Sequence, residues 1–327
     1  MNQVKISVVI PFYNAKDYIT QAVESALNQL ETGEVIIVED NSPDGGLEIC
    51  QYLAEKYPNV RLLRHADGKN HGAGSTRNLG IQNAVFPYIA FLDADDYYLP
   101  NRFSKTVEIF MNKKEVDGVY EAIGVTYQNL SVKESFKKLS FKEITTISEG
   151  VSPEDLFERI INGEIGHFSF DGFTIKKDAF HKTGLFSEEL IFFEDTDLMF
   201  KLCAKAILYP GSIDNPIAIR RVHNQNRITY HLADKRKSYH TYEIMWMSLC
   251  QWGEKNLTPK QKKIVLRRFI THIRKIDTFS DFSWTDYLIS RNKMIGLACN
   301  FPELFLDRYF WRRLIPSREI FTKHEQF

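Results

Sequence analysis

The sequence has few cysteines and no excess of charge of either sign. Its four cysteines are widely scattered and form no C-x-x-C pair, which argues against a zinc site and a disulfide scaffold and fits a reducing compartment. Lysine and arginine together number 42, and aspartate and glutamate together also number 42. The net charge therefore gives no indication of a nucleic-acid partner, and we expect none.

Long hydrophobic runs are also missing. The apolar run in MNQVKISVVIPFYN is too short for a signal peptide, and no stretch approaches the roughly 18 apolar residues of a membrane-spanning helix. Hydrophobic residues at 43% and charged residues at 26% are typical of a soluble globular protein. We therefore expect a cytoplasmic protein, and contact with the inner face of a membrane stays open.

A regular alternation of strand and helix patterns fills the first 120 residues. Runs of β-branched and aliphatic residues predict strands at 5–11, 34–40, 59–65 and 87–93, and apolar residues at helical spacing follow them. Such alternation indicates βαβ units. The predicted fold class is therefore α/β, with a Rossmann-like, mostly parallel central sheet flanked by helices.

The pattern becomes less regular beyond residue 116. Residues 127–150 are rich in lysine and serine and predict an insertion or a mobile segment. Helices are predicted at 152–161 and 194–206, the first with a serine cap and early acids. From residue 231 onward the patterns indicate amphipathic helices only.

Three carboxylates directly follow the fourth predicted strand, in the stretch FLDADDYY. In a parallel sheet, ligands bind outside the carboxyl ends of the strands, where Tyr13, Asn14 and residues 39–44 are also expected. The acids at 93–96 allow two interpretations. They form a solvated turn, or they bind a hard cation such as Mg²⁺ or Mn²⁺, which prefers carboxylate oxygens and is often shared with a diphosphate.

Four segments taken in order resemble the nucleotide-sugar-binding half of a family 2 glycosyltransferase. They are SVVIPFYNAKDYITQAVESALNQ, EVIIVEDNSPDGG, AGSTRNLGI and YIAFLDADD. The resemblance is continuous from residue 5 to about 110, and FFEDTDLMFKL and RRVHNQNRIT extend it to about 230. It implies a bacterial-type enzyme with the GT-A fold that inverts the configuration of the transferred sugar.

The resemblance also implies a division of the chain. Residues 1–230 would form the GT-A catalytic domain, with a nucleotide-sugar-binding half at 1–115 and an acceptor-side half at 116–230. Residues 231–327 are not covered by the resemblance, and their amphipathic helical patterns predict a helical C-terminal domain.

The family pattern implies roles for four residues on the nucleotide side. Tyr13 would stack on or flank the uracil ring, and the region of Pro11 would contact the base through its backbone. Asp40 would accept a hydrogen bond from the base N3–H, and Arg77 would pair with Asp40 or a phosphate. Without the resemblance, Tyr13 also fits a core aromatic, Asp40 a turn cap and Arg77 a surface helix residue.

Roles in the acidic stretch differ from residue to residue. Asp93 would contact the ribose, and Ala94 belongs to the same nucleotide-sugar-binding stretch. Asp95 would ligate the metal that bridges the diphosphate, and Asp96 would support it. His223, in the basic segment RRVHNQNRIT, would complete the metal shell or bind a phosphate oxygen, and its imidazole suits Mn²⁺ better than Mg²⁺.

The second acidic group, EDTD, begins a predicted helix, where acids are common because they complement the helix dipole. The resemblance aligns Asp195 with the base that deprotonates the acceptor hydroxyl. Glu194 would orient Asp195 or contact the acceptor, and Asp197 is expected to be a solvated helix residue. The loop HADGKNHGAG is expected to be a flexible rim, because the spacing of its histidines supports no metal site.

The expected reaction moves a hexose or N-acetylhexosamine from a UDP-sugar to a hydroxyl of a glycan, glycoprotein or lipid-linked saccharide, with Mn²⁺ or Mg²⁺. Two alternatives are a non-catalytic sugar-nucleotide-binding scaffold and a nucleotidyltransferase, although PFYNAKD lacks the glycine-rich turn of the latter. In the tail, LRRFITHIRKI and FLDRYFWRRLI combine aromatics with basic residues. These helices fit packing, including homo-oligomerisation, or peripheral membrane contact.

Overall fold

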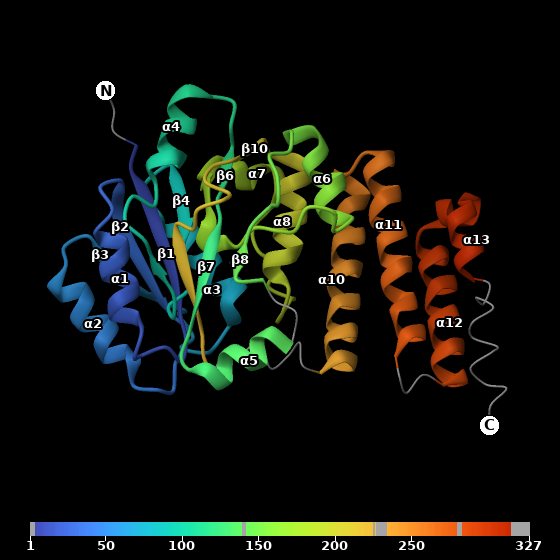
Figure 1. The fold of residues 1–327 in the computed structure, drawn as a ribbon, viewed down its shortest axis with the longest axis horizontal. Helices are drawn as coiled ribbons and strands as arrows, with labels where there is room; N and C mark the ends of the chain where they lie inside the picture. Colours follow the sequence, from blue (N-terminus) through green and yellow to red (C-terminus); the bar gives the residue numbers. More distant parts are fainter. Residues whose placement is uncertain (1–3, 139–141, 225, 227–233, 280–282, 315–327) are drawn as a thin grey trace. The chain divides into compact units, whose positions relative to one another are not determined.

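The four strands predicted before residue 93 lie side by side in a seven-stranded sheet in the computed structural model, which describes residues 4–138, 142–224, 226, 234–279 and 283–314 (Figure 1). The strands of this sheet are β1 (Ile6–Phe12), β2 (Thr32–Glu39), β3 (Val60–Arg64), β4 (Tyr88–Phe91), β6 (Gly118–Tyr120), β9 (Phe173–Lys176) and β10 (Leu208–Pro210). Their order is β10-β6-β9-β4-β1-β2-β3. Among the described strands of this seven-stranded sheet, only β9 runs antiparallel to its neighbours, which are β4 and β6. The predicted mostly parallel sheet is confirmed.

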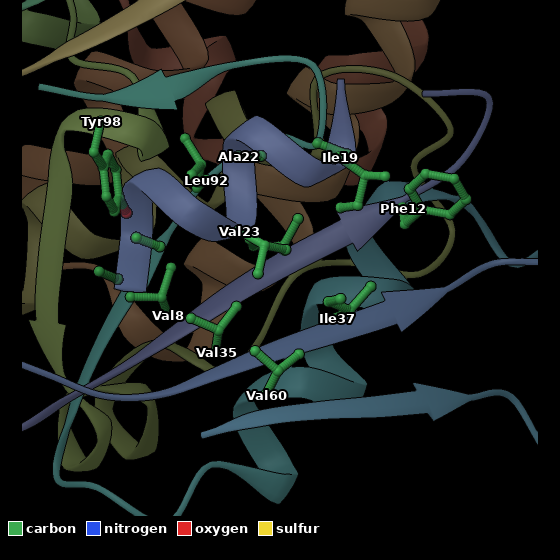
Figure 2. Packing of buried hydrophobic residues seen from close by; sticks show 14 of the residues in the cluster. Val8, Phe12, Ile19, Ala22, Val23, Val35, Ile37, Val60, Leu92 and Tyr98 are labelled. Carbon is green, nitrogen blue, oxygen red and sulfur yellow. The ribbon is translucent and has the colours of Figure 1, made fainter. Parts of the chain in front are cut away.

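Helices cover both faces of this sheet because its central strands are apolar on both sides. On one face, α1 (Ile19–Leu27) packs over β1 and β2 (Figure 2), and α2 (Gly46–Lys56) lies beside α1 (Figure 1). On the opposite face, α3 (Gly72–Asn83) approaches β1 closely. A Cβ at Gly80 would lie 2.4 Å from a methyl carbon of Val9, so a larger residue there would force α3 away from the strand.

A second, four-stranded sheet completes the first 230 residues, and the sequence patterns did not predict it. Its order is β5-β11-β7-β8, and β7 and β11 run parallel. The strands are β5 (Tyr97–Tyr98), β7 (Ile123–Tyr127), β8 (Ile144–Thr145) and β11 (Ala218–Val222). The stretch 127–150, expected to be an insertion or mobile, therefore contributes a strand, and it also contains α5 (Leu130–Lys138).

The remaining helical turns of this part connect the two sheets or cover them. They are α4 (Ser104–Asn112), α6 (Pro153–Ile161), η1 (Phe170–Gly172), η2 (Lys177–Ala179), α7 (Phe180–Thr183) and α8 (Glu194–Lys205). Ser152 caps α6 by accepting a hydrogen bond from the backbone N–H of Asp155, as its sequence predicts. The predicted helices at 152–161 and 194–206 are thus present.

The chain separates into two compact units, Met1–Tyr230 and His231–Phe327. The described part of the second unit is helical throughout, as expected. Its helices are α10 (Lys235–Asn256), α11 (Pro259–Ile273), η3 (Arg274–Thr278), α12 (Trp284–Asn300), η4 (Pro302–Leu306) and α13 (Arg308–Leu314). Capping boxes at Thr258 and Ser283 begin α11 and α12. All four cysteines of the chain are free.

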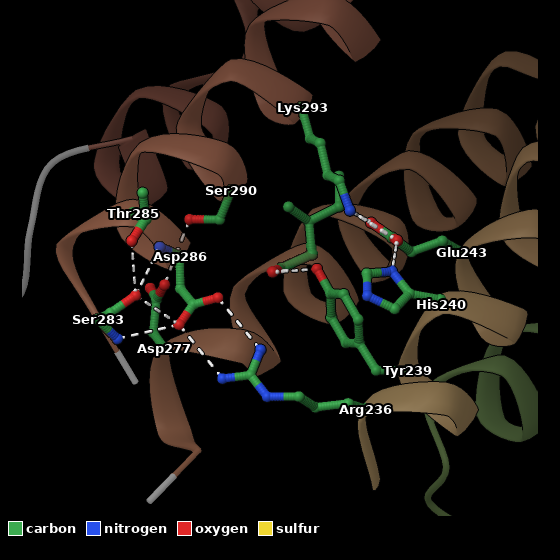
Figure 3. A network of polar contacts seen from close by, with 11 residues as sticks. Arg236, Tyr239, His240, Glu243, Asp277, Ser283, Thr285, Asp286, Ser290 and Lys293 are labelled. Carbon is green, nitrogen blue, oxygen red and sulfur yellow. Dashed lines mark hydrogen bonds and ion pairs between the residues drawn. The ribbon is translucent and has the colours of Figure 1, made fainter. Parts of the chain in front are cut away.

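Ion pairs between helices hold α12 in the second unit (Figure 3). Lys293 of α12 pairs with Glu243 of α10 at 2.7 Å, and Asp286 accepts from Arg236 at 3.2 Å. Tyr239 of α10 donates to the backbone carbonyl of Ile273 at 2.9 Å. These contacts turn the charged side of α12 toward its neighbours.

Helix α11, which includes most of the LRRFITHIRKI stretch, packs its apolar side within the second unit. Its buried residues include Val265, Leu266, Phe269 and Ile270. The apolar face of α11 is therefore occupied by its own unit. Among the described residues, no helix has the length and apolar character that crossing a membrane requires.

Candidate active site

Two predicted nucleotide-side residues, Pro11 and Tyr13, lie at the carboxyl end of β1, next to the carboxyl end of β2. Pro11 pairs with Val38 in the parallel register of the two strands, and Tyr13 follows β1 with its side chain half exposed. Asn14 adopts a φ of 54° and its N–H donates to Ser42, which follows β2. An exposed aromatic ring at this edge is available for stacking, so the predicted role of Tyr13 has a suitable surface.

Asp40 is buried where β2 ends, and backbone groups engage its carboxylate. One oxygen accepts from the N–H of His71 at 2.7 Å, and the other accepts from the N–H of Gly72 at 2.8 Å. The imidazole rings of His65 and His71 stack on each other, with 4.1 Å between their centroids. Asp40 thus holds the rim loop at the start of α3, and the predicted contact of Asp40 with a uracil stays a prediction.

Arg77 of α3 connects the two acidic groups of the sequence. Its guanidinium donates to Asp93 at 2.6 Å and lies 3.4 Å from Glu194. Burial acts to lower the pKa of Arg77, but the charges of Asp93, Glu194 and Asp195 outweigh it and raise the pKa. Arg77 therefore contacts two carboxylates from other elements rather than Asp40, and its predicted pairing with a phosphate stays a prediction.

The first turn of α8 carries the second acidic group. Phe193 turns the chain into the helix with a φ of 62°, a conformation that is uncommon for a bulky residue. Glu194 then points inward to Arg77, whereas Asp195 is exposed. One oxygen of Asp195 accepts from the N–H of Thr196 at 2.7 Å. Glu194 contacts the guanidinium of Arg77, and Asp195 presents its carboxylate to solvent.

Asp197 contradicts the expectation that it is a solvated helix residue. Its side chain is fully buried and forms an ion pair with Lys201, one turn further along α8. The residue lies on the inward face of the helix, where a carboxylate requires a partner. Asp197 therefore stabilises α8 through this ion pair.

Asp95 and His223 meet although 128 residues separate them. The Nε2 atom of His223 lies 2.9 Å from a carboxylate oxygen of Asp95, and the amide of Asn226 donates to the same oxygen at 3.1 Å. The Asp95 side chain is 27% exposed. A carboxylate oxygen and an imidazole nitrogen that converge beside solvent are a suitable pair of ligands for Mn²⁺ or Mg²⁺.

Strand β11 holds the turn that contains Asp95. The guanidinium of Arg221 donates to the backbone carbonyl of Asp95 and to Gln21, and lies over the rings of Tyr18 and Tyr97. Part of the segment RRVHNQNRIT, residues 225 and 227–229, lies outside the described residues. The described part positions His223 rather than leaving it on a free loop.

Ala94 points away from the solvent edge. The residue is 4% exposed and belongs to the hydrophobic core below the turn. The predicted contact of Ala94 with a nucleotide stays a prediction. Asp93 differs, because its side chain is 42% exposed and reaches the solvent edge.

Asp171, in the stretch FSFDGF, was missed by the sequence analysis. It is buried in η1, its carboxylate accepts from the N–H of Asp93 at 2.8 Å, and its carboxyl group hydrogen-bonds that of Asp96. Asp96 in turn accepts from the N–H of Arg221 at 2.7 Å. Burial raises the pKa of Asp171 to about 7 and that of Asp96 well above its usual range. The pair therefore holds a proton up to a higher pH than an isolated carboxyl group does.

Asp93, Asp96 and Asp171 bring ligand atoms within 4.8 Å of one another, which would also suit a cation. The buried oxygens of Asp96 and Asp171 are already engaged with backbone N–H groups and with each other. We therefore interpret the Asp96–Asp171 pair as a structural contact that joins the acidic turn, residues 93–96, to η1 and β11.

We expect Asp171→Ala to lower kcat/KM by about tenfold to a hundredfold, since a buried N–H of Asp93 would lose its acceptor at a cost of about 1–3 kcal/mol. Asp171→Asn is the matched control, because an amide oxygen still accepts from Asp93 and the amide N–H₂ donates to Asp96. Steady-state kinetics of the two variants test this. Equal activity of the alanine and wild-type proteins would show that the pair supports nothing in the site.

A family model described as "Glycosyl transferase family 2" matches residues 7–184 of this chain, which include β1 to β4, the acidic turn and Asp171. The chain belongs to glycosyl transferase family 2. The resemblance drawn from the four sequence segments is thereby confirmed.

Several relatives share parts of this family 2 chain. "Uncharacterized glycosyltransferase YibD" of Escherichia coli is 38% identical over 133 residues, which are 38% of this chain and 38% of that protein. "Minor teichoic acid biosynthesis protein GgaB" of Bacillus subtilis is 40% identical over 115 residues, 34% of this chain and 13% of that protein. The chain thus matches well under two thirds of the length of either relative.

The crystal structure of TarS residues 1–349 from S. aureus in complex with UDP-GlcNAc shares the fold. The TM-score is 0.61 at 17% identity, and the match covers 84% of this chain and 73% of that chain. The predicted family 2 GT-A fold, followed by a helical C-terminal region, is confirmed.

Two supporting residues of the family 2 site had weak signals in the sequence. Asp171 is an acid inside an aromatic run, where a charged side chain is unexpected unless it is paired. Asn226 follows His223 by three residues, and its side chain accepts from the backbone N–H of His223 at 2.6 Å. Both positions bear on the acidic turn, and neither was assigned a role from the sequence.

Proposed function

We propose that this family 2 glycosyltransferase moves a hexose or N-acetylhexosamine from a UDP-sugar to a hydroxyl group of a glycan or glycoconjugate, with inversion at the anomeric carbon. The observation that carries the proposal is the position of Arg77, which contacts Asp93 and Glu194 at once. The two acidic motifs, about a hundred residues apart in sequence, therefore border one site.

The donor would lie along the carboxyl edge of β1, β2 and β4. Tyr13 is exposed there for contact with the base, and the exposed carboxylate of Asp93 is available to ribose hydroxyls. Asp95 and His223 would hold Mn²⁺ or Mg²⁺ next to the diphosphate. When bound, the cation would offset the negative charge that develops on the departing UDP.

Asp195 would act as the general base. Among the described residues, Oδ1 of Asp195 accepts hydrogen bonds from the backbone and side chain of Thr196. Asp195 is exposed, so its carboxylate is accessible to an acceptor hydroxyl. Its proton would move to Asp195, the hydroxyl oxygen would bond to the anomeric carbon, and the bond from that carbon to the UDP oxygen would break.

A role in polysaccharide or glycoprotein glycan assembly fits the similarity to GgaB, a minor teichoic acid biosynthesis protein, and to a chondroitin synthase of Pasteurella multocida. The family membership favours transfer over the scaffold and nucleotidyltransferase alternatives. A cytoplasmic location, expected from the sequence, stays a prediction.

We expect the purified chain to release UDP from one of the common UDP-sugars in the presence of Mn²⁺, and EDTA to abolish this release. A panel of UDP-glucose, UDP-galactose and their N-acetyl derivatives, with saccharide acceptors, measures donor choice and metal dependence together. Binding of UDP without release from any donor would favour the scaffold alternative instead.

A further inference from the structure

The second unit is basic although the whole chain is neutral. Residues 231–327 contain 18 lysines and arginines against 10 aspartates and glutamates, whereas the full chain has 42 of each. The unit thus carries a net charge of about +8, and the preceding 230 residues carry the opposite charge. Charge asymmetry of this size between two parts of a chain indicates a negatively charged partner for the basic part.

Helix α12 turns its charged side toward its own unit and its uncharged side toward solvent, the reverse of an ordinary surface helix. Its charged residues Asp286, Arg291 and Lys293 form ion pairs with Arg236, Asp277 and Glu243 of the same unit. Figure 3 shows the pairs of Asp286 and Lys293. The exposed residues of the helix recur at three- and four-residue spacing, so they form one stripe, and none of them is charged.

The stripe is largely apolar. Trp284 is 47% exposed, Leu288 57% and Ile295 44%, and these three positions follow one face of the helix over about three turns. A surface helix normally faces water with its charged side. The α12 stripe does the opposite, which indicates that something other than water covers it.

A second apolar patch follows α12 in the chain. Leu306 of η4 is 89% exposed, and Phe305 and Trp311 are about half as exposed. The indole N–H of Trp311 donates to the backbone carbonyl of Phe305 at 2.8 Å, which fixes the two rings near each other. Arg308 and Arg312 of α13 are exposed in the same stretch. Aromatic, aliphatic and basic side chains are combined here as in helices that lie on membranes.

We propose that the α12 stripe and the η4–α13 patch dock on an anionic lipid surface. The apolar side chains would enter the boundary of the acyl chains, and the positive charge of the unit would be attracted by acidic headgroups. The same charge would make two copies of this unit repel each other, so a lipid surface fits better than a second copy. The docking face is thus not α11, whose apolar residues are buried.

The test uses the full chain and flotation with vesicles of phosphatidylcholine, with or without phosphatidylglycerol. We expect the protein to float with vesicles that contain phosphatidylglycerol, and added salt to weaken the binding. The double variant Leu288→Gln, Leu306→Gln should bind at least about tenfold more weakly, since two exposed leucines could no longer be buried in lipid. Both positions are exposed, and circular dichroism checks that the variant is folded.

Leu30→Gln is the matched control, because Leu30 is 80% exposed in the first unit and should not affect flotation. Failure of the wild-type protein to float with either vesicle would overturn the proposal. Equal, salt-insensitive binding to both vesicles would contradict the role of charge. A dimer in light scattering that the double variant dissociates, without flotation, would instead assign the stripe to contact between copies. None of these readouts requires sugar transfer.

Discussion

Asp195→Asn is expected to lower kcat by about a hundredfold to ten-thousandfold while leaving UDP affinity unchanged. The variant keeps the size of the side chain and its hydrogen bond from Thr196, but an amide cannot take the proton of an acceptor hydroxyl. A positioned general base contributes about this much to a rate. Transfer kinetics and calorimetric titration with UDP measure the two quantities separately.

The control for this variant is Glu189→Gln, which removes another exposed carboxylate shortly before α8. It has no contact with Arg77 among the interactions recorded for the described residues, and it should leave kcat close to the wild-type value. If Asp195→Asn retained more than about a tenth of the wild-type kcat, Asp195 would not be the base.

His223→Ala is expected to weaken Mn²⁺ binding in the presence of UDP by at least about tenfold and to lower kcat/KM correspondingly. The imidazole is one of two groups that converge on the predicted cation position, and loss of even an outer-shell partner commonly costs 10–100-fold in metal affinity. Asp95→Asn should have a larger effect, because it also removes a negative charge. Titration of Mn²⁺ against activity and against binding measures both effects.

His240→Ala provides the comparison for His223→Ala. His240 also pairs with a carboxylate, that of Glu243 at 3.0 Å, but it lies exposed on α10 in the helical unit. Its removal should not alter the Mn²⁺ requirement. An unchanged Mn²⁺ titration of the His223→Ala protein would separate His223 from the metal.

Local patterns predicted β1 and β2 because each is an apolar run that is almost entirely buried. They could not predict the second sheet, since β5 and β8 have two residues each and their pairing depends on distant parts of the chain. The antiparallel direction of β9 was equally inaccessible. Its sequence, FTIK, contains nothing that specifies the direction of its neighbours.

The candidate site was predictable to the extent that it follows the motifs. The resemblance implied that Asp95 ligates a metal and that His223 completes its shell or binds a phosphate oxygen, and the structure brings the two side chains within 2.9 Å. The partners of Arg77 and the burial of Asp197 could not be predicted, because both depend on which face of a helix turns inward. Asp171 also required the fold, since η1 has to reach the acidic turn from about 75 residues away.

The most direct test of the account is the crystal structure of the protein with UDP and Mn²⁺, measured at the manganese absorption edge. We predict an anomalous peak between Oδ2 of Asp95 and Nε2 of His223, with the diphosphate bound to the same ion and Asp195 across the sugar site. A peak among Asp93, Asp96 and Asp171, or UDP bound away from the carboxyl edge of β1 and β2, would contradict it.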